Sequence, residues 1–235
     1  MAKEISFEKS VLIVGGNSSL ASPLIERATQ DDFRVLATYK NRTRTVKNLS
    51  DDSMFELNLE SRESIDSLLQ SLGGVEFQRI YILIGKLSQQ DPYNISYESL
   101  TNYFQVYGVN LCYLIDRLTT LLSKDIPSFL IFISSRAAIS PSYDVMYSST
   151  KACVTSFVRS RASFLHFNQI AVSVTSGLII GSNMYREMSN QIDRHLELSG
   201  GQLLNVEQFT KELWNLDFES LKSRTSQVIN IGPVY

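Results

Sequence analysis

The sequence predicts an α/β fold: a doubly wound, mostly parallel sheet of about seven strands with helices on both faces. Short apolar runs alternate with longer amphipathic stretches along almost the whole chain. The runs are rich in β-branched residues and apolar on both faces, as strands buried between two helix layers are. Because no Pro/Gly/Ser-rich linker divides the chain, we expect residues 1–235 to form a single domain.

The apolar runs are the expected strands, at residues 11–14, 34–38, 54–58, 80–84, 129–133, 171–175 and 228–231. The stretches between them carry apolar residues at helical spacing, as Ile65, Leu68 and Leu72 do. Pro23 fits the first turn of the first helix, where a missing N–H breaks no intrahelical bond. The expected helices span residues 20–30, 61–72, 97–122, 144–167, 206–216 and 218–223.

The composition excludes several classes of protein. The net charge of −2 lacks the basic excess of a nucleic-acid binder, so we expect no nucleic-acid partner. No apolar run approaches the ~20 residues that cross a bilayer, and the first residues lack the apolar core of a signal peptide. We therefore expect no membrane association and a cytoplasmic location. Two cysteines and two isolated histidines form neither a disulfide framework nor a metal site.

A glycine pair directly follows the first expected strand and opens a helix. Gly15 and Gly16 are followed by Asn17, Ser18 and Ser19. A tight glycine turn there lets backbone N–H groups approach a phosphate at the helix N-terminus. By itself, the motif is a weak signal, because its glycines are incomplete, and the alternative is an ordinary strand-to-helix turn.

Basic residues follow the second expected strand. A protein that binds NAD normally carries an acidic residue about 20 residues beyond the glycines, to hold the ribose 2′-hydroxyl. Here Tyr39 is followed by the cations Lys40, Arg42 and Arg44, with no acid among them. If a dinucleotide binds, these cations favour the 2′-phosphate of NADP over NAD. The alternative is a solvated basic loop.

Tyr147 and Lys151 lie four residues apart, so they share one face of the expected helix 144–167. A phenol has a pKa of about 10, and a nearby ammonium lowers that pKa by stabilising the phenolate. The pair can then act as general acid and base on an alcohol or carbonyl. A serine pair, Ser134 and Ser135, ends the preceding strand and offers a hydroxyl to the same oxygen.

The chain places a strand, a serine, a loop and a helix with Tyr-x-x-x-Lys in this order. This arrangement resembles the short-chain dehydrogenase/reductase family, in its small single-domain form. The resemblance runs from about residue 10 to residue 232. It implies a Rossmann-type sheet in the order 3-2-1-4-5-6-7 and an NAD(P)-dependent reaction at a carbonyl or carbinol carbon.

The resemblance also implies catalytic roles. Tyr147 matches the family's proton donor and acceptor, and Lys151 matches the lysine that lowers its pKa and holds the nicotinamide ribose. Ser135 best matches the serine that orients the substrate oxygen, with Ser134 as the alternative. Asn110 matches the helix asparagine that supports a proton-relay water beside the lysine.

The cofactor-binding half departs further from the family pattern. Gly16 matches the first required glycine, whereas Leu20 and Ser22 stand where the other two belong. Asn58 replaces the family's aspartate near the adenine, and Ser182 stands in for the threonine that meets the carboxamide. The cofactor-binding residues that the resemblance implies are Gly15, Gly16, Asn17, Ser18, Ser19, Leu20, Tyr39, Lys40, Arg42, Asn58, Leu59, Gly85, Tyr147, Lys151, Gly177, Ile179 and Ser182.

The leading hypothesis is an NADP(H)-dependent oxidoreductase that interconverts a carbonyl and an alcohol. A non-catalytic NADP(H)-sensing protein is the first alternative, and a sugar-nucleotide-modifying enzyme is the second. Residues 181–201 interrupt the strand–helix alternation and are the candidate substrate lid. Their polar side chains suggest a small polar substrate. The resemblance further implies a homodimer or homotetramer that packs through helices 97–122 and 144–167.

Overall fold

The structure is a computed structural model that describes residues 9–41, 49–140, 142–188, 203–222 and 228–232. Its seven strands form one parallel sheet in the order β3-β2-β1-β4-β5-β6-β7, which confirms the predicted order. The strands are β1 (Ser10–Val14), β2 (Arg34–Tyr39), β3 (Met54–Glu56), β4 (Arg79–Ile82), β5 (Ser128–Ile133), β6 (Gln169–Thr175) and β7 (Val228–Asn230). The order reverses between β1 and β4, so a crevice is expected at the carboxyl ends of these strands.

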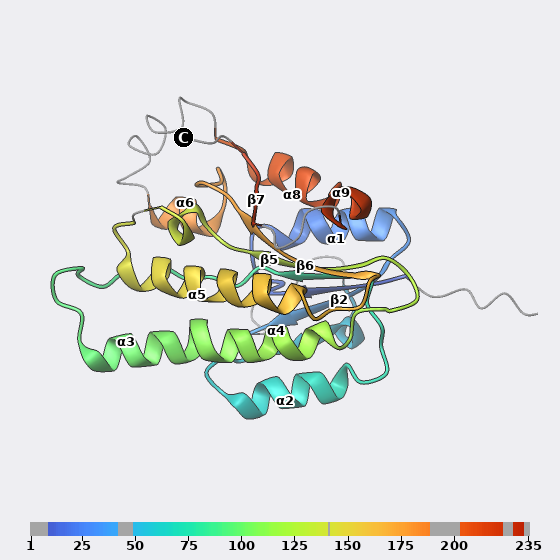
Figure 1. Cartoon of the computed structure of the whole chain (residues 1–235), viewed down its shortest axis with the longest axis horizontal. Helices are drawn as coiled ribbons and strands as arrows, with labels where there is room; N and C mark the ends of the chain where they lie inside the picture. Colours follow the sequence, from blue (N-terminus) through green and yellow to red (C-terminus); the bar gives the residue numbers. More distant parts are fainter. Residues whose placement is uncertain (1–8, 42–48, 141, 189–202, 223–227, 233–235) are drawn as a thin grey trace, which may run out of the picture.

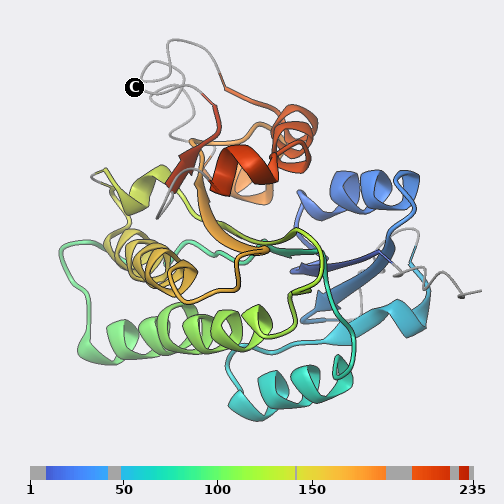
Figure 2. The same cartoon turned by 45° about the vertical axis from the view of Figure 1, so that its right-hand side comes forward.

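Helices cover both faces of the sheet (Figures 1 and 2). One face packs against α1 (Ala21–Gln30), α8 (Val206–Trp214) and α9 (Phe218–Lys222). The other face packs against α2 (Arg62–Ser71), α4 (Leu111–Thr119) and α5 (Val145–Ala162).

The apolar run of β1 supplies both of these cores. Val11 and Ile13 point into the core that contains α1, whereas Leu12 and Val14 point into the core that contains α2. Successive side chains of a strand alternate between the two faces of the sheet. A central strand that is covered on both faces is therefore apolar at every position, which is why the run is continuous rather than alternating.

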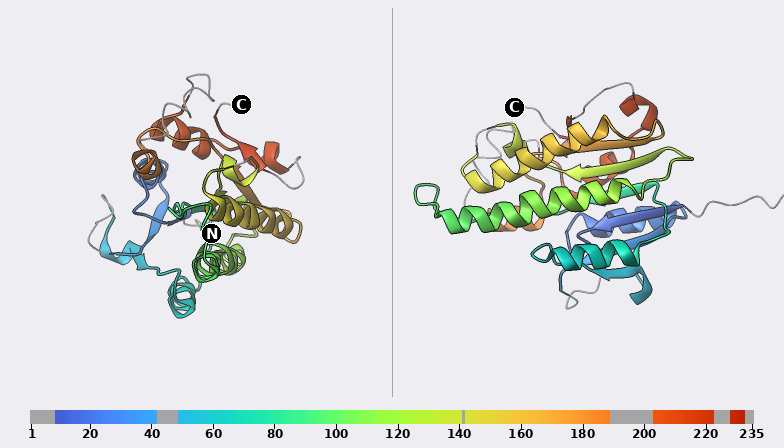
Figure 3. Two further views of the ribbon diagram at one scale, coloured as in Figure 1. Left: turned by 90° about the vertical axis from the view of Figure 1, so that its left-hand side faces the viewer. Right: turned by 60° about the horizontal axis from the view of Figure 1, so that its bottom comes forward.

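The long helix predicted over residues 97–122 differs from the prediction in the middle and at its end. It consists of α3 (Tyr97–Phe104), a π-helical segment (Gln105–Asn110) and α4, which together form one continuous rod (Figure 3). Gln105 Nε2 donates to Asn110 Oδ1 over 2.9 Å, across the widened turn. At the end, the Thr119 hydroxyl donates back to the Asp116 carbonyl over 2.6 Å, and α4 stops at Thr119.

Other expected boundaries shift by a few residues. Asp144 caps α5 rather than beginning it, and the helix ends at Ala162 instead of residue 167. The candidate lid, residues 181–201, begins with the short helix α6 (Asn183–Glu187), and its residues 189–201 lie outside the described residues. None of the described helices combines the length and the apolar character needed to cross a membrane.

The core position of Leu12 gives a prediction about stability. Leu12 is fully buried in β1, in register with Leu36 of β2 and Ile80 of β4. Leu12→Ala should lower the free energy of unfolding by about 2–5 kcal/mol, because it removes buried methyl groups and leaves a cavity. Urea denaturation measures the change. The control Leu100→Ala, at a position 39% exposed on α3, should cost less than about 1 kcal/mol. Equal losses for the two variants would contradict this assignment of the core.

Candidate active site

The carboxyl ends of the central strands border a cleft of about 330 Å³. A second hollow of about 180 Å³ adjoins it and shares Gly15, Asn17, Ile84 and Tyr107 with it. The predicted residues that line the cleft are Gly15, Asn17, Ser18, Ser19, Leu20, Gly85, Ser135, Tyr147, Lys151, Gly177, Ile179 and Ser182. Those that line the second hollow also include Tyr39, Lys40, Asn58 and Leu59. Gly16 and Asn110 line neither, and Arg42 lies outside the described residues.

Tyr147 stands in the first turn of α5, and Asp144 fixes that turn. The Asp144 carboxylate accepts the backbone N–H of Tyr147 over 2.9 Å, as an N-cap does. It also accepts both the N–H and the hydroxyl of Ser88, each over 2.6 Å. The start of α5 is thereby fastened to the loop that follows β4. This contact fixes the position of Tyr147 relative to that loop.

The phenol of Tyr147 is buried, with 5% of the residue exposed, and both Tyr147 and Ser135 line the cleft. Burial raises the pKa of Tyr147 to about 12, although the nearby Ser135 hydroxyl acts to lower it. Ser134 instead hydrogen-bonds Thr155 over 2.6 Å in a buried contact. The structure therefore places Ser135, the preferred candidate, beside the phenol and turns the Ser134 hydroxyl towards α5.

Lys151 lies one turn further along the same face of α5 and is 6% exposed. Its ammonium donates to the carbonyls of Ile84 over 2.9 Å and Ile133 over 2.7 Å, and it lies 4.6 Å from the ring centre of Phe132. Burial lowers the pKa of Lys151 to about 7, because desolvation disfavours the charged form.

Gly85 leaves the room that Lys151 needs. A Cβ atom at this position would lie 3.0 Å from Lys151 Nζ and 3.1 Å from Cε. Such contacts are tighter than most Cβ contacts in proteins, so with a larger residue the end of the lysine would have to shift by a few tenths of an ångström. Gly85 therefore helps to keep Lys151 in its position in the cleft.

The glycine turn is held by β2. Gly15 has a φ of +97°, which favours glycine, and its N–H donates to the Thr38 hydroxyl over 3.0 Å. The Gly16 N–H donates to the Thr38 carbonyl over 2.7 Å, and Gly16 is buried behind the lining residues. Donors for a ligand must therefore come from the residues that follow. Ser18 and Ser19 line the cleft there, and α1 begins with no side-chain cap on its N-terminal N–H groups.

The loop after β6 forms the opposite wall of the cleft. The Asn183 N–H donates to Ser19 Oγ over 3.2 Å, so this loop is joined to the glycine turn. The Ser182 hydroxyl oxygen caps α6 by accepting the Tyr185 N–H over 3.0 Å. Next to Tyr147, the side chains are mostly apolar and form a small cluster of Leu87, Leu178, Met188 and, partly buried, Ala137, Met184 and Tyr185.

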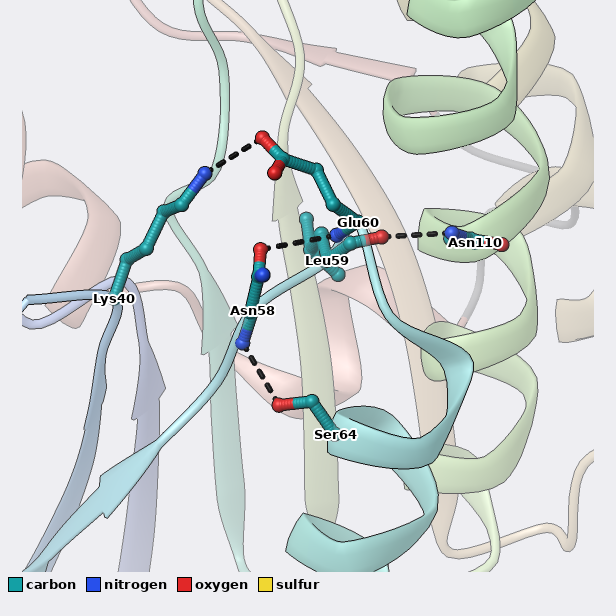
Figure 4. Close-up of polar contacts among 6 residues, drawn as sticks. All are labelled: Lys40, Asn58, Leu59, Glu60, Ser64 and Asn110. Carbon is teal, nitrogen blue, oxygen red and sulfur yellow. Dashed lines mark hydrogen bonds and ion pairs between the residues drawn. The ribbon is translucent and has the colours of Figure 1, made fainter.

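Asn110 makes two side-chain hydrogen bonds within the protein. Its Nδ2 donates to the Leu59 carbonyl over 2.7 Å (Figure 4). Its Oδ1 accepts from Gln105 Nε2 over 2.9 Å. The amide thus fastens the π-helical segment to the loop after β3, and the role of Asn110 in supporting a relay water beside Lys151 stays a prediction.

Several residues of the site were missed by sequence reasoning. Asp144 could have been found from the sequence, because an aspartate just before a helix is a typical N-cap, whose carboxylate accepts an N–H from the first turn. No sequence pattern indicates the other two residues. Glu60 pairs with Lys40 over 2.7 Å, and Tyr107 lines both hollows. Both reach the site through the packing of distant segments. Among the described residues, no three His, Cys, Asp or Glu side chains are grouped so as to hold a metal ion.

Comparison with known proteins agrees with this geometry. The model of the family described as short chain dehydrogenase matches residues 9–193. No curated protein matches the chain. Among solved structures, a short chain dehydrogenase family protein from Francisella tularensis subsp. tularensis SCHU S4 is similar, with a TM-score of 0.76 and 19% identity. That match covers 95% of this chain and 96% of the other.

Two further similar structures contain NADP. One is the RhlG/NADP active-site complex of Pseudomonas aeruginosa, with a TM-score of 0.78 and 20% identity over 95% of this chain and 94% of that one. The other is the angucycline C-6 ketoreductase LanV with bound NADP, with a TM-score of 0.80 and 16% identity over 94% of this chain and 93% of that one. At these identities, the likeness shows a shared fold.

The buried lysine predicts a pH dependence of stability. The pKa of Lys151 is about 7 in the folded chain and 10.5 ordinarily, so between these values the unfolded chain binds more protons. Stability should therefore rise with pH from about 7 to about 10, by at most about 1.4 kcal/mol per pH unit from this group. Lys151→Met should remove that rise, as urea midpoints across this pH range would show.

Lys211→Met is the matched control, because Lys211 is exposed on α8. This variant should keep the pH dependence of the wild type. If Lys151→Met keeps it as well, then Lys151 is not the group whose deprotonation stabilises the fold.

Proposed function

Because the chain belongs to the short-chain dehydrogenase family, we propose that it is an NADP-dependent oxidoreductase that interconverts a carbonyl and an alcohol on a small molecule. One observation carries this proposal: Ser135, Tyr147 and Lys151 line a single cleft at the carboxyl ends of the strands. A protein that only bound a dinucleotide would have no need of this group of side chains.

The residues present fit a dinucleotide. The cleft adjoins a second hollow, so an extended molecule can run past Gly15 and Asn17 from one to the other. In the first turn of α1, no side chain caps the Ser22 N–H, and Ser18 and Ser19 line the cleft just before it, which suits a phosphate group. Lys40 on the rim of the second hollow is a cation for a 2′-phosphate, and the NADP in two similar structures supports the same choice.

A bound nicotinamide supplies the hydride, and the chain's own residues handle the proton. The phenol of Tyr147, with a pKa of about 12, holds its proton at neutral pH and can donate it to a carbonyl oxygen during reduction. The Ser135 hydroxyl offers the same oxygen a second hydrogen bond. When Lys151 is protonated, its positive charge stabilises the phenolate left after transfer, and in alcohol oxidation the same groups act in reverse.

The described wall beside Tyr147 bears on the substrate. Leu178 and Met184 line the cleft, and Leu87 and Met188 pack behind them. We therefore propose a substrate with a small apolar group next to the reacting carbon. Of the polar residues that suggested a polar substrate, Asn183 lines the cleft and Tyr185 and Arg186 lie on α6, whereas those at 190–195 lie outside the described residues.

A non-catalytic NADP(H)-sensing protein is the second candidate. It is favoured by the glycine turn, in which the N–H groups of Gly15 and Gly16 both bond to Thr38 rather than face the cleft. A turnover assay separates the two candidates, because a sensing protein binds NADPH without consuming it.

The first test of the proposal is Tyr147→Phe. This variant should bind NADPH as the wild type does but lose about 10²- to 10⁴-fold in kcat on a panel of small ketones and aldehydes, since no acid remains at the reacting oxygen. NADPH fluorescence measures the binding, and NADPH consumption measures the rate. The control Ser148→Ala changes an exposed hydroxyl on the next residue, which bonds to the Val145 carbonyl, and should have the wild-type rate. NADPH binding without turnover in the wild type would support the sensing protein instead.

The second test separates the two serines. Ser135→Ala should lower kcat at least tenfold, because the carbonyl oxygen loses a hydrogen bond that strengthens as charge develops on it. Ser134→Ala should lower thermal stability, since it leaves the buried Thr155 hydroxyl without its partner at 2.6 Å, and should change kcat less than threefold. The reverse pattern would make Ser134 the catalytic serine.

A further inference from the structure

An ion pair spans the rim of the second hollow. Lys40 Nζ lies 2.7 Å from Glu60 Oε1, and both residues line the hollow (Figure 4). Lys40 follows β2 and Glu60 follows β3, so the sheet brings together two residues that are 20 apart in the sequence. The side chains are 55% and 60% exposed, which leaves both accessible to a ligand. The cation that the sequence analysis assigned to a phosphate therefore already has an anionic partner.

The loop that carries Glu60 is fixed from two sides. The Glu60 N–H donates to Asn58 Oδ1 over 3.1 Å, and the Asn58 N–H donates to the Ser64 hydroxyl of α2 over 2.9 Å. The Leu59 carbonyl accepts from Asn110 over 2.7 Å. Figure 4 shows these bonds leading from the loop to α2 on one side and to the π-helical segment on the other. The carboxylate is thus presented at the hollow by a backbone with little freedom.

The charge of Glu60 acts within the hollow. Its hydrogen bond and ion pair with Lys40 lower the pKa of Glu60, so the carboxylate is ionised at neutral pH. On the other side, its negative charge adds to burial in raising the pKa of Tyr107, which also lines the hollow. A ligand placed between Lys40 and Tyr107 is therefore exposed to the field of this carboxylate.

We infer that Glu60 sets the cofactor preference of this site by competing with a 2′-phosphate for Lys40 and by offering an acceptor to a ribose hydroxyl. The inference rests on the proposed function. An exposed ion pair is weak, so a phosphate can displace Glu60 from Lys40. The carboxylate then remains near the phosphate and repels it, whereas a 2′-hydroxyl meets no such repulsion. The site should therefore prefer NADPH over NADH by a smaller ratio of Kd values than Lys40 alone would give.

The test is Glu60→Gln, which removes the charge and keeps the size. At low ionic strength, the Kd for NADPH should fall about tenfold, because the repulsion and the competition for Lys40 both disappear. The Kd for NADH should change less than threefold, since an amide oxygen still accepts a hydroxyl proton. Isothermal titration of both cofactors gives the ratio of the two Kd values, and its change should shrink in high salt.

Two variants control for other effects of charge. Glu63→Gln removes the same charge one turn away, where the carboxylate accepts from the Ser61 hydroxyl over 2.8 Å and does not line the hollow. It should leave the ratio of Kd values unchanged. Lys40→Gln should weaken NADPH alone and make the further Glu60→Gln change smaller, because competition for the cation is gone.

An unchanged ratio in Glu60→Gln, or an equal change in Glu63→Gln, would overturn the inference while leaving the proposed function in place. If neither cofactor binds the wild type at millimolar concentration, the proposed function fails and the inference fails with it.

Discussion

The buried ammonium of Lys151 is the interaction on which the site depends. In place of water, it hydrogen-bonds two backbone carbonyls, those of Ile84 and Ile133, at the ends of neighbouring strands. Those carbonyls are available because β4 and β5 are parallel and end at the same edge of the sheet. A Cβ atom at position 85 would lie 3.0 Å from Lys151 Nζ, so the glycine there avoids a tight contact with the lysine. The cost of desolvation lowers the pKa of Lys151 to about 7, so a nearby negative charge readily favours its protonation.

The other polar groups of the cleft are anchored to the same edge of the sheet. Asp144 fastens the first turn of α5, and so Tyr147, to the loop after β4. Thr38 at the end of β2 takes the N–H groups of both glycines. In each case a short-range bond satisfies backbone or carboxylate atoms that would otherwise be costly to bury. The side chains of Tyr147 and Ser135 both line the cleft, where they can meet a ligand.

Much of the fold and of the chemistry could be predicted from the sequence. Continuous apolar runs such as residues 11–14 indicate strands covered on both faces, and the structure contains all seven predicted strands. Tyr147 and Lys151 share a helix face because of their spacing alone, and their cleft follows from strand order. Helix ends and the π-helical segment were not predictable, because they depend on single bonds such as that between Gln105 and Asn110.

The sequence by itself determined the class of fold and placed Tyr147 and Lys151, the proposed pair for proton transfer, on one helix face, because both follow from local periodicity. Tertiary structure alone decided which charges face one another. No acid stands near Lys40 among residues 38–44 of the sequence, yet the pairing of β2 with β3 brings Glu60 to it at 2.7 Å. It also decided that Asn110 holds a loop and that Ser135, not Ser134, meets Tyr147. Electrostatic and hydrogen-bonded contacts act over a few ångströms in space, whatever the separation of the residues along the chain.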